Sequence, residues 1–174
     1  MKILYLHGFG GHYSPQKKKV QELSQLGEVS GYSIDWTRPS ETILKEAKKH
    51  IGGVDLVVGI SMGGWLAATL GDRNEIPFVA MNPMIDPKNS YLLKSLLEPE
   101  IIDGYSDFPK NEAGLILLDQ GDRVINSYVT YDKMHEYYDC RLFTGGSHRF
   151  EHIKESISII RSFVDFTELA WGRT

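Results

Sequence analysis

The sequence predicts an α/β fold in which a mostly parallel sheet of about six strands is flanked by helices. Short apolar runs alternate with segments of helical periodicity from one end of the chain to the other. Right-handed crossovers would then cover both faces of the sheet. The chain has 174 residues, 41% of them hydrophobic and 24% charged, which suits one globular domain with a sizeable core. We therefore expect a single domain over residues 1–174.

The expected strands are short apolar runs bounded by glycine, proline or polar residues, which is typical of strands buried on both faces. They lie at residues 3–6, 29–36, 54–58, 77–81, 114–119 and 141–143. The expected helices carry apolar residues at helical spacing, and some have capping signals such as Ser14-Pro15 at the start and Gly27 at the end. They lie at residues 14–26, 39–51, 126–137 and 150–166, and a further helix begins with residues 64–70.

One insertion interrupts this alternation, at residues 82–111. It is rich in Pro, Asp, Ser and Lys, and its longest apolar stretch runs from Tyr91 to Leu97. Insertions of this length between two strands are often binding loops or lids. A plain packed crossover helix with long connections fits the pattern equally well. We expect a small cap or lid here and keep Tyr91 as a candidate substrate contact.

Composition and charge exclude several classes of protein. The net charge is −4, and the basic run Lys17–Lys19 is interpreted as a solvated helix face, so nucleic acid is not an expected partner. No apolar run approaches the length of a membrane span, and no secretory signal precedes the first strand. The single cysteine, Cys140, allows no intramolecular disulfide and is expected to pack rather than react. These features indicate the cytoplasm, with no metal ion.

The stretch from Gly59 to Gly63 is the strongest functional signal. It reads Gly-Ile-Ser-Met-Gly between an expected buried strand and an expected helix. In that context Ser61 occupies a sharp, strained turn that lifts its Oγ above the sheet edge, and the glycines allow the backbone to bend without Cβ clashes. The alternative is an ordinary strand-to-helix turn with a surface serine.

A serine nucleophile needs a base within hydrogen-bond reach and a third group that orients the base. In a parallel sheet these groups should lie in loops at the carboxyl ends of strands. His148 follows the last expected strand in a glycine-rich loop, and Asp122 lies in a glycine turn after the strand before it. We assign His148 as base and Asp122 as acid. Asp119 is the second choice of acid, and His152, one turn into the last helix, is expected to face outward or sideways.

Backbone amides should bind the negative charge that forms on the substrate oxygen. Met62 follows the nucleophile at a helix N-terminus, and Phe9 lies in the Gly-rich loop after the first strand, so we assign these two amides. Gly8 and Gly10 in the same loop are candidate substrate contacts. His7 could be mistaken for the base, but it is expected to brace the loop through hydrogen bonds.

Arg123 directly follows the expected acid. It could pair with an acidic group of the substrate. A surface position at the start of a helix explains it as well.

Four motifs together resemble a known family. They are His7-Gly8-Phe9-Gly10-Gly11, Gly59-Ile60-Ser61-Met62-Gly63-Gly64, Gly121-Asp122 and Gly146-Ser147-His148. In this order and spacing they resemble the small bacterial YqiA/YcfP-type esterases of the α/β-hydrolase superfamily, over nearly the whole chain. The resemblance implies a compact α/β-hydrolase fold with a Ser-His-Asp site and no cofactor. The chain departs from larger α/β-hydrolases because it lacks their leading antiparallel strands and has a very small cap.

The expected function is hydrolysis of carboxylic esters or thioesters of small acyl groups through an acyl-enzyme intermediate, with a small molecule as substrate. The same residues could also serve carbon–carbon cleavage, elimination or acyl transfer. A non-catalytic module that uses the pocket to hold a ligand is the alternative from another class. Substrate identity and oligomeric state stay open.

Overall fold

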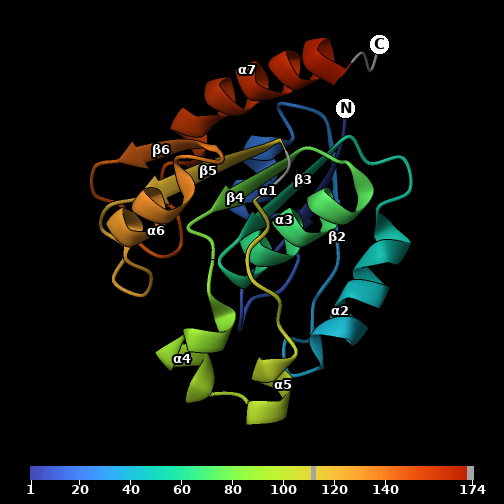
Figure 1. Cartoon of the computed structure of the whole chain (residues 1–174). Coiled ribbons are helices and arrows are strands. Elements are labelled where there is room, and N and C mark those ends of the chain that lie inside the picture. The colour runs from blue at the N-terminus through green and yellow to red at the C-terminus, as the bar shows by residue number, and fades with distance from the viewer. Residues whose placement is uncertain (111–112, 172–174) are drawn as a thin grey trace.

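The computed structural model describes residues 1–110 and 113–171. Its core is a six-stranded sheet of order β2-β1-β3-β4-β5-β6, and every strand pair in the described residues is parallel (Figure 1). The strands are β1 (Lys2–Leu6), β2 (Glu28–Gly31), β3 (Leu56–Ile60), β4 (Phe78–Met81), β5 (Gly114–Asp119) and β6 (Asp139–Phe143). The predicted α/β class and strand number are confirmed.

Helices cover both faces of the sheet, as the crossovers require. One face packs against α1 (Lys18–Leu23) and α7 (Ile153–Trp171). The other packs against α2 (Ser40–Ala47), α3 (Met62–Asn74) and α6 (Ser127–Met134), and the short 3-10 helix η1 (Lys48–His50) follows α2. The central strands β3, β4 and β5 are buried throughout, which explains their uninterrupted apolar sequences. None of the helices in the described ranges combines the length and apolar character of a membrane span.

The second expected strand is shorter than predicted. Pairing ends at Gly31, and the chain then leaves the sheet although Ile34 and Trp36 are buried. The N–H of Ile34 donates to Nε2 of His7 at 2.7 Å instead of to a neighbouring strand. Apolar residues in this segment therefore indicate core packing and not strand pairing. The first helix is also shorter than predicted and begins at Lys18.

The insertion after β4 contains η2 (Pro87–Asn89), α4 (Tyr91–Lys94) and α5 (Pro99–Asp103), and α4 and α5 lie beyond one end of the sheet (Figure 1). Its second half is fixed to the core. Tyr105 is buried edge-on against Trp65 of α3, with ring centroids 4.9 Å apart. The indole N–H of Trp65 also donates to the Ser106 carbonyl at 2.9 Å. Residue 111, the last of the predicted insertion, lies outside the described residues, and a lid function stays a prediction.

The strand order changes direction at β1 and β3. These strands are neighbours, and Leu6 at the end of β1 pairs with Gly59 of β3. Connections on either side of such a point diverge, which leaves a crevice at the carboxyl ends of the strands. The loops that follow β1, β3, β5 and β6 all emerge at this edge because the strands are parallel. These loops carry the candidate site.

Candidate active site

Ser61 lies between β3 and α3 in a strained conformation, with φ 55° and ψ −120°. Glycines make this turn possible. A Cβ on Gly59 would lie 1.9 Å from the carbonyl oxygen of Gly63, and a Cβ on Gly63 would lie 2.2 Å from that of Leu6. The Ser61 carbonyl oxygen accepts hydrogen bonds from amides of the first turn of α3 and, at 3.1 Å, from Met84. The fold therefore holds the serine in place from both sides.

The structure brings the three residues of the expected triad together. Ser61 Oγ lies 2.9 Å from His148 Nε2, and His148 Nδ1 lies 2.8 Å from Asp122 Oδ2. A carboxylate only accepts, so the network assigns the imidazole proton to Nδ1 and leaves Nε2 free to accept from the serine hydroxyl. The Asp122 side chain is almost completely buried, and its other oxygen accepts hydrogen bonds from the amides of Val124 and Ile125. The acid is thus fixed before any substrate binds.

The two expected oxyanion donors lie beside Ser61. Met62 is the first residue of α3, where an amide has no partner within the helix. The loop of Phe9 approaches the serine closely, since a Cβ on Gly8 would lie 3.0 Å from the Ser61 Cβ. Within the described part of the chain, neither the Phe9 amide nor the Met62 amide donates a hydrogen bond to another group. Both amides therefore have no competing acceptor among these residues.

His7 braces this loop, as expected. It is buried, its Nε2 accepts from the Ile34 amide, and its Nδ1 donates to the Gly8 carbonyl at 2.7 Å. Burial lowers the pKa of His7 below its ordinary value, which favours the neutral ring that this pattern requires. Both ring nitrogens are occupied, so His7 is not positioned to act as a base.

A second Asp–His pair lies behind the first. Asp119 at the end of β5 is fully buried, and its Oδ1 lies 2.7 Å from Nδ1 of His152. Its Oδ2 accepts hydrogen bonds from the amides of Ser147 at 3.1 Å and Glu151 at 2.7 Å. A Cβ on Gly146 would lie 2.0 Å from the same Oδ2, so the carboxylate fills the space that this glycine leaves. The expectation that His152 faces outward or sideways is wrong, because this buried acid requires a partner.

Asn82 is a residue that sequence analysis missed. It follows β4 directly, with φ +42°, and its side-chain amide donates to the Ser147 carbonyl at 2.9 Å. Its Oδ1 accepts from the Asp119 amide at 2.8 Å. Asn82 therefore ties the end of β5 to the loop that carries His148. Its position at the carboxyl end of a strand is the signal that the sequence offers for this role.

A pocket of about 540 Å³ opens beside Ser61 and His148. Gly8 and Gly10 line it, and their contact with substrate stays a prediction. The run Lys17–Lys19 lines it as well, together with Arg149. The expectation of a solvated helix face holds for Lys18, which is exposed in α1. Lys17 instead precedes the helix, and both Lys17 and Lys19 are partly buried.

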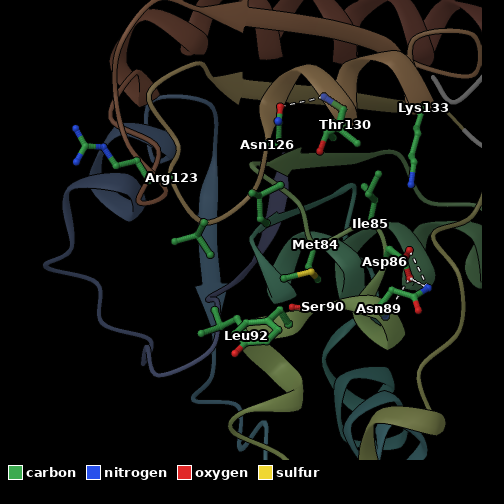
Figure 2. A pocket seen from close by; sticks show the side chains of 14 residues that line it. Met84, Ile85, Asp86, Asn89, Ser90, Leu92, Arg123, Asn126, Thr130 and Lys133 are labelled. Atoms are coloured by element: carbon green, nitrogen blue, oxygen red, sulfur yellow. Dashed lines mark hydrogen bonds between the residues drawn. The ribbon is translucent and has the colours of Figure 1, made fainter.

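Arg123 and Tyr91 lie elsewhere. They line a second hollow of about 460 Å³, between the insertion and α6, and no residue of the triad lines it (Figure 2). Met84 and Ile85 form part of its apolar wall. The Arg123 side chain points away from the other labelled side chains in Figure 2. The structure does not bring either residue to Ser61.

Cys140 lies half-buried in β6. Burial, with a smaller effect of neighbouring Asp139, raises the pKa of its thiol to about 12. The thiol therefore stays protonated near neutral pH and packs, as expected. In the residues that the structure describes, no group of three or more His, Cys, Asp or Glu side chains is placed to hold a metal ion.

Comparison with solved structures defines the class. The chain has the α/β-hydrolase fold, with a TM-score of 0.73 to alpha/beta hydrolase domain-containing protein 10 from mouse, at 14% identity over 95% of this chain and 90% of that one. It superposes on a monoacylglycerol lipase from Paleococcus ferrophilus with a TM-score of 0.69, at 14% identity over 94% of both chains. Est1E from Butyrivibrio proteoclasticus gives 0.68, at 15% identity over 95% of this chain and 86% of that one. At these identities the likeness establishes the fold.

Sequence comparison then gives the family. Residues 2–100 match the model of the uncharacterised protein family UPF0227, and the chain belongs to this family. The UPF0227 protein YcfP from Escherichia coli is 27% identical over 175 aligned residues, covering 92% of this chain and 97% of the relative. A UPF0227 protein from Yersinia enterocolitica is 28% identical with the same coverage. The resemblance to YcfP-type proteins inferred from the motifs is confirmed.

Proposed function

We propose that the protein is a cytoplasmic serine hydrolase that cleaves carboxylic esters or thioesters of small acyl groups. One observation carries this proposal. Ser61 Oγ, His148 and Asp122 form a continuous hydrogen-bonded chain with distances of 2.9 and 2.8 Å, beside two backbone amides that have no partner among the described residues. A nucleophile, a base, an orienting acid and oxyanion donors are the complete set that acyl transfer to serine requires.

The reaction follows from the positions of these groups. Ser61 Oγ attacks the carbonyl carbon of the substrate while His148 Nε2 takes its proton. The amides of Phe9 and Met62 bind the oxygen that becomes negative. The imidazolium of His148 then protonates the leaving alcohol or thiol, and the acyl group stays on Ser61 as an ester. A water molecule attacks this ester, gives its proton to His148 and releases the acid, and the proton returns to Ser61. Asp122 orients the imidazole throughout and stabilises its charge.

Other chemistries use the same parts, and the comparisons support hydrolysis of esters most directly. Two of the solved structures that share the fold are those of a monoacylglycerol lipase and of Est1E, and one structure of Est1E has ferulic acid bound. Carbon–carbon cleavage, elimination and acyl transfer remain alternatives for the same site. A ligand-binding module has no need of a serine that donates to a histidine, and the available oxyanion amides favour an enzyme.

The first prediction concerns Ser61→Ala. The variant should lose hydrolysis of 4-nitrophenyl acetate by about 10⁴–10⁶ in kcat, because the nucleophile is absent. The fold should persist, since the backbone that holds the turn is unchanged, and circular dichroism checks this. A fluorophosphonate should label the wild-type protein at Ser61 and leave the variant unlabelled. Hydrolysis that survives in the purified, folded variant would show that Ser61 is not the nucleophile.

The second prediction concerns acyl length. Each methylene removed from water contributes about 0.8 kcal/mol, so kcat/KM should rise about fourfold for each carbon that finds apolar wall. The insertion is small, and part of its apolar surface, Tyr91 and Leu96, faces solvent. We expect the rise to stop at about two to six carbons. A series of 4-nitrophenyl esters below their micelle concentrations tests this, and a continued rise to long chains would contradict it.

A further inference from the structure

The pocket beside Ser61 has a strongly basic wall. Lys17, Lys18, Lys19 and Arg149 all line it, and we call these four residues the basic cluster. Among the described residues that line this pocket, none is an aspartate or glutamate. The chain as a whole has a net charge of −4, so this wall is opposite in sign to the average surface. Local charge of this kind attracts ligands of the other sign.

The charges of the basic cluster are close enough to act on one another. Burial lowers the pKa of Lys19, and the neighbouring charges of Lys18, Arg149 and Lys17 lower it further, while Asp119 opposes them. Like charges brought together and partly buried cost free energy unless a counter-charge is present. A bound anion would therefore stabilise the basic cluster.

Among the described residues, Asp119 acts on the basic cluster by its charge but forms no ion pair with it. Asp119 is the acid whose charge acts on Lys19, but both of its oxygens are already bound to His152 and to two backbone amides. In the described residues, the side-chain nitrogens of Lys18, Lys19 and Arg149 have no carboxylate within ion-pair distance. The Lys17 ammonium donates to the His12 carbonyl at 2.5 Å, which holds it at the pocket without neutralising it.

The position of the basic cluster indicates which part of a substrate it would meet. Arg149 directly follows His148, and both line the same pocket. His148 must reach the atom of the leaving group in order to protonate it. The second hollow shares no lining residue with this pocket, and Arg123, Lys133 and Asp86 line it beside the apolar residues. A negative charge on the leaving group would therefore lie next to the basic residues.

We propose, on the basis of the hydrolase function above, that the alcohol or thiol part of the natural substrate carries a phosphate or carboxylate that binds to the basic cluster. The anion does not take part in bond formation. It positions the scissile bond between Ser61 and His148 and raises kcat/KM for anionic substrates over neutral ones.

The test compares three acetate esters that differ in the para group of the leaving phenol. 4-Acetoxybenzamide is neutral, 4-acetoxybenzoate carries a carboxylate, and 4-acetoxyphenyl phosphate carries a phosphate. The quantity of interest is the ratio of kcat/KM for each anionic ester to that for the neutral ester, with spontaneous hydrolysis subtracted. Comparing this ratio between wild type and variants removes the intrinsic reactivity of each ester. The phosphate and carboxylate arms then show which anion the site prefers.

The variants are Lys18→Gln, Arg149→Gln and the double variant, all at exposed positions where the substitution removes charge but not core packing. Each single change should lower the anionic-to-neutral ratio about threefold to tenfold at low salt, and sodium chloride near 1 M should reduce the wild-type ratio in the same direction. Lys45→Gln, an exposed residue of α2, makes the same charge change away from the pocket and should leave the ratio unchanged.

The outcomes separate the two proposals. A lower ratio in the basic-cluster variants and an unchanged ratio in Lys45→Gln support the anion site. Ser61-dependent hydrolysis with the same ratio in wild type and double variant would overturn the anion site and leave the hydrolase function intact. An equal drop in Lys45→Gln would also overturn it, because net charge alone would then explain the preference. Hydrolysis that does not depend on Ser61 would overturn the proposed function itself.

Discussion

Two Asp–His pairs lie a few residues apart in this chain, and the distance from the carboxylate oxygen to the ring nitrogen is nearly equal in both. Asp122 meets His148 at 2.8 Å, and Asp119 meets His152 at 2.7 Å. Both acids come from the end of β5, and both histidines follow the glycine loop after β6. The distance between acid and histidine therefore does not identify a catalytic base.

The second ring nitrogen is what separates the pairs. In His148 it faces Ser61 Oγ at 2.9 Å. The ring of His152 instead stacks on Phe143, with centroids 5.1 Å apart. The two acids differ as well, since Asp119 also binds two backbone amides of the loop around His148, while Asp122 binds the amides that follow it in its own turn. This difference supports the proposal that the Asp122–His148 pair transfers protons, while the Asp119–His152 pair holds the loop in place.

This comparison predicts that one of two matched substitutions lowers activity and that the other lowers stability. Asp122→Asn should lower kcat/KM for an activated ester by about 10⁴, because the amide no longer fixes the tautomer in which Nε2 accepts the serine proton. Asp119→Asn should have a far milder effect on kcat/KM. It should instead lower the free energy of unfolding, because asparagine has only one acceptor oxygen, so either the Ser147 and Glu151 amides or the His152 ring loses its acceptor. Steady-state kinetics and urea denaturation of both variants measure the two effects.

The contrary result is also well defined. If Asp119→Asn loses more activity than Asp122→Asn under the same conditions, with both proteins folded, then the assignment of the acid is wrong. Asparagine is close to aspartate in size at both positions, so the two variants are controls for each other.

The sequence predicts the parts of this site that depend on local pattern and chain order. Ser61 is indicated by glycines at fixed spacing, and His148 and Asp122 by their places after successive strands. The six parallel strands follow from the same alternation, which the structure confirms. Each of these signals lies within a few residues of the feature that it predicts.

What the sequence did not predict depends on contacts between distant segments. His152 turns inward because a buried acid 33 positions away needs a donor. Asn82 joins β5 to a loop 65 residues farther on. The run Lys17–Lys19 looks like any solvated basic run until the fold brings it beside Arg149. Asn82 is indicated only by its place directly after a strand, and nothing in the local pattern of His152 or of Lys17–Lys19 distinguishes them from surface positions.

The last prediction addresses the supporting pair itself. His152→Ala should lower the free energy of unfolding by about 1–3 kcal/mol, because it leaves an oxygen of the buried Asp119 without its donor. His152→Asn places an amide N–H close to the former position of Nδ1 and should restore most of that loss. Both variants lack the ring that stacks on Phe143, so their difference isolates the hydrogen bond to Asp119. Chemical denaturation of the two variants beside wild type measures it.

The activity of the same variants tests whether the Asp119–His152 pair affects the reaction only by holding His148 in place. His152→Ala should lower kcat by less than about tenfold and leave KM nearly unchanged, since the misplacement of His148 affects the chemical step more than substrate binding. His152→Asn should recover most of the kcat, as it recovers stability. His148→Asn should lose activity as completely as Ser61→Ala, because no amide can take the serine proton. A folded His152→Ala protein as inactive as His148→Asn would show that the second pair takes part in the reaction. That result would contradict the assignment of proton transfer to one pair and of loop support to the other.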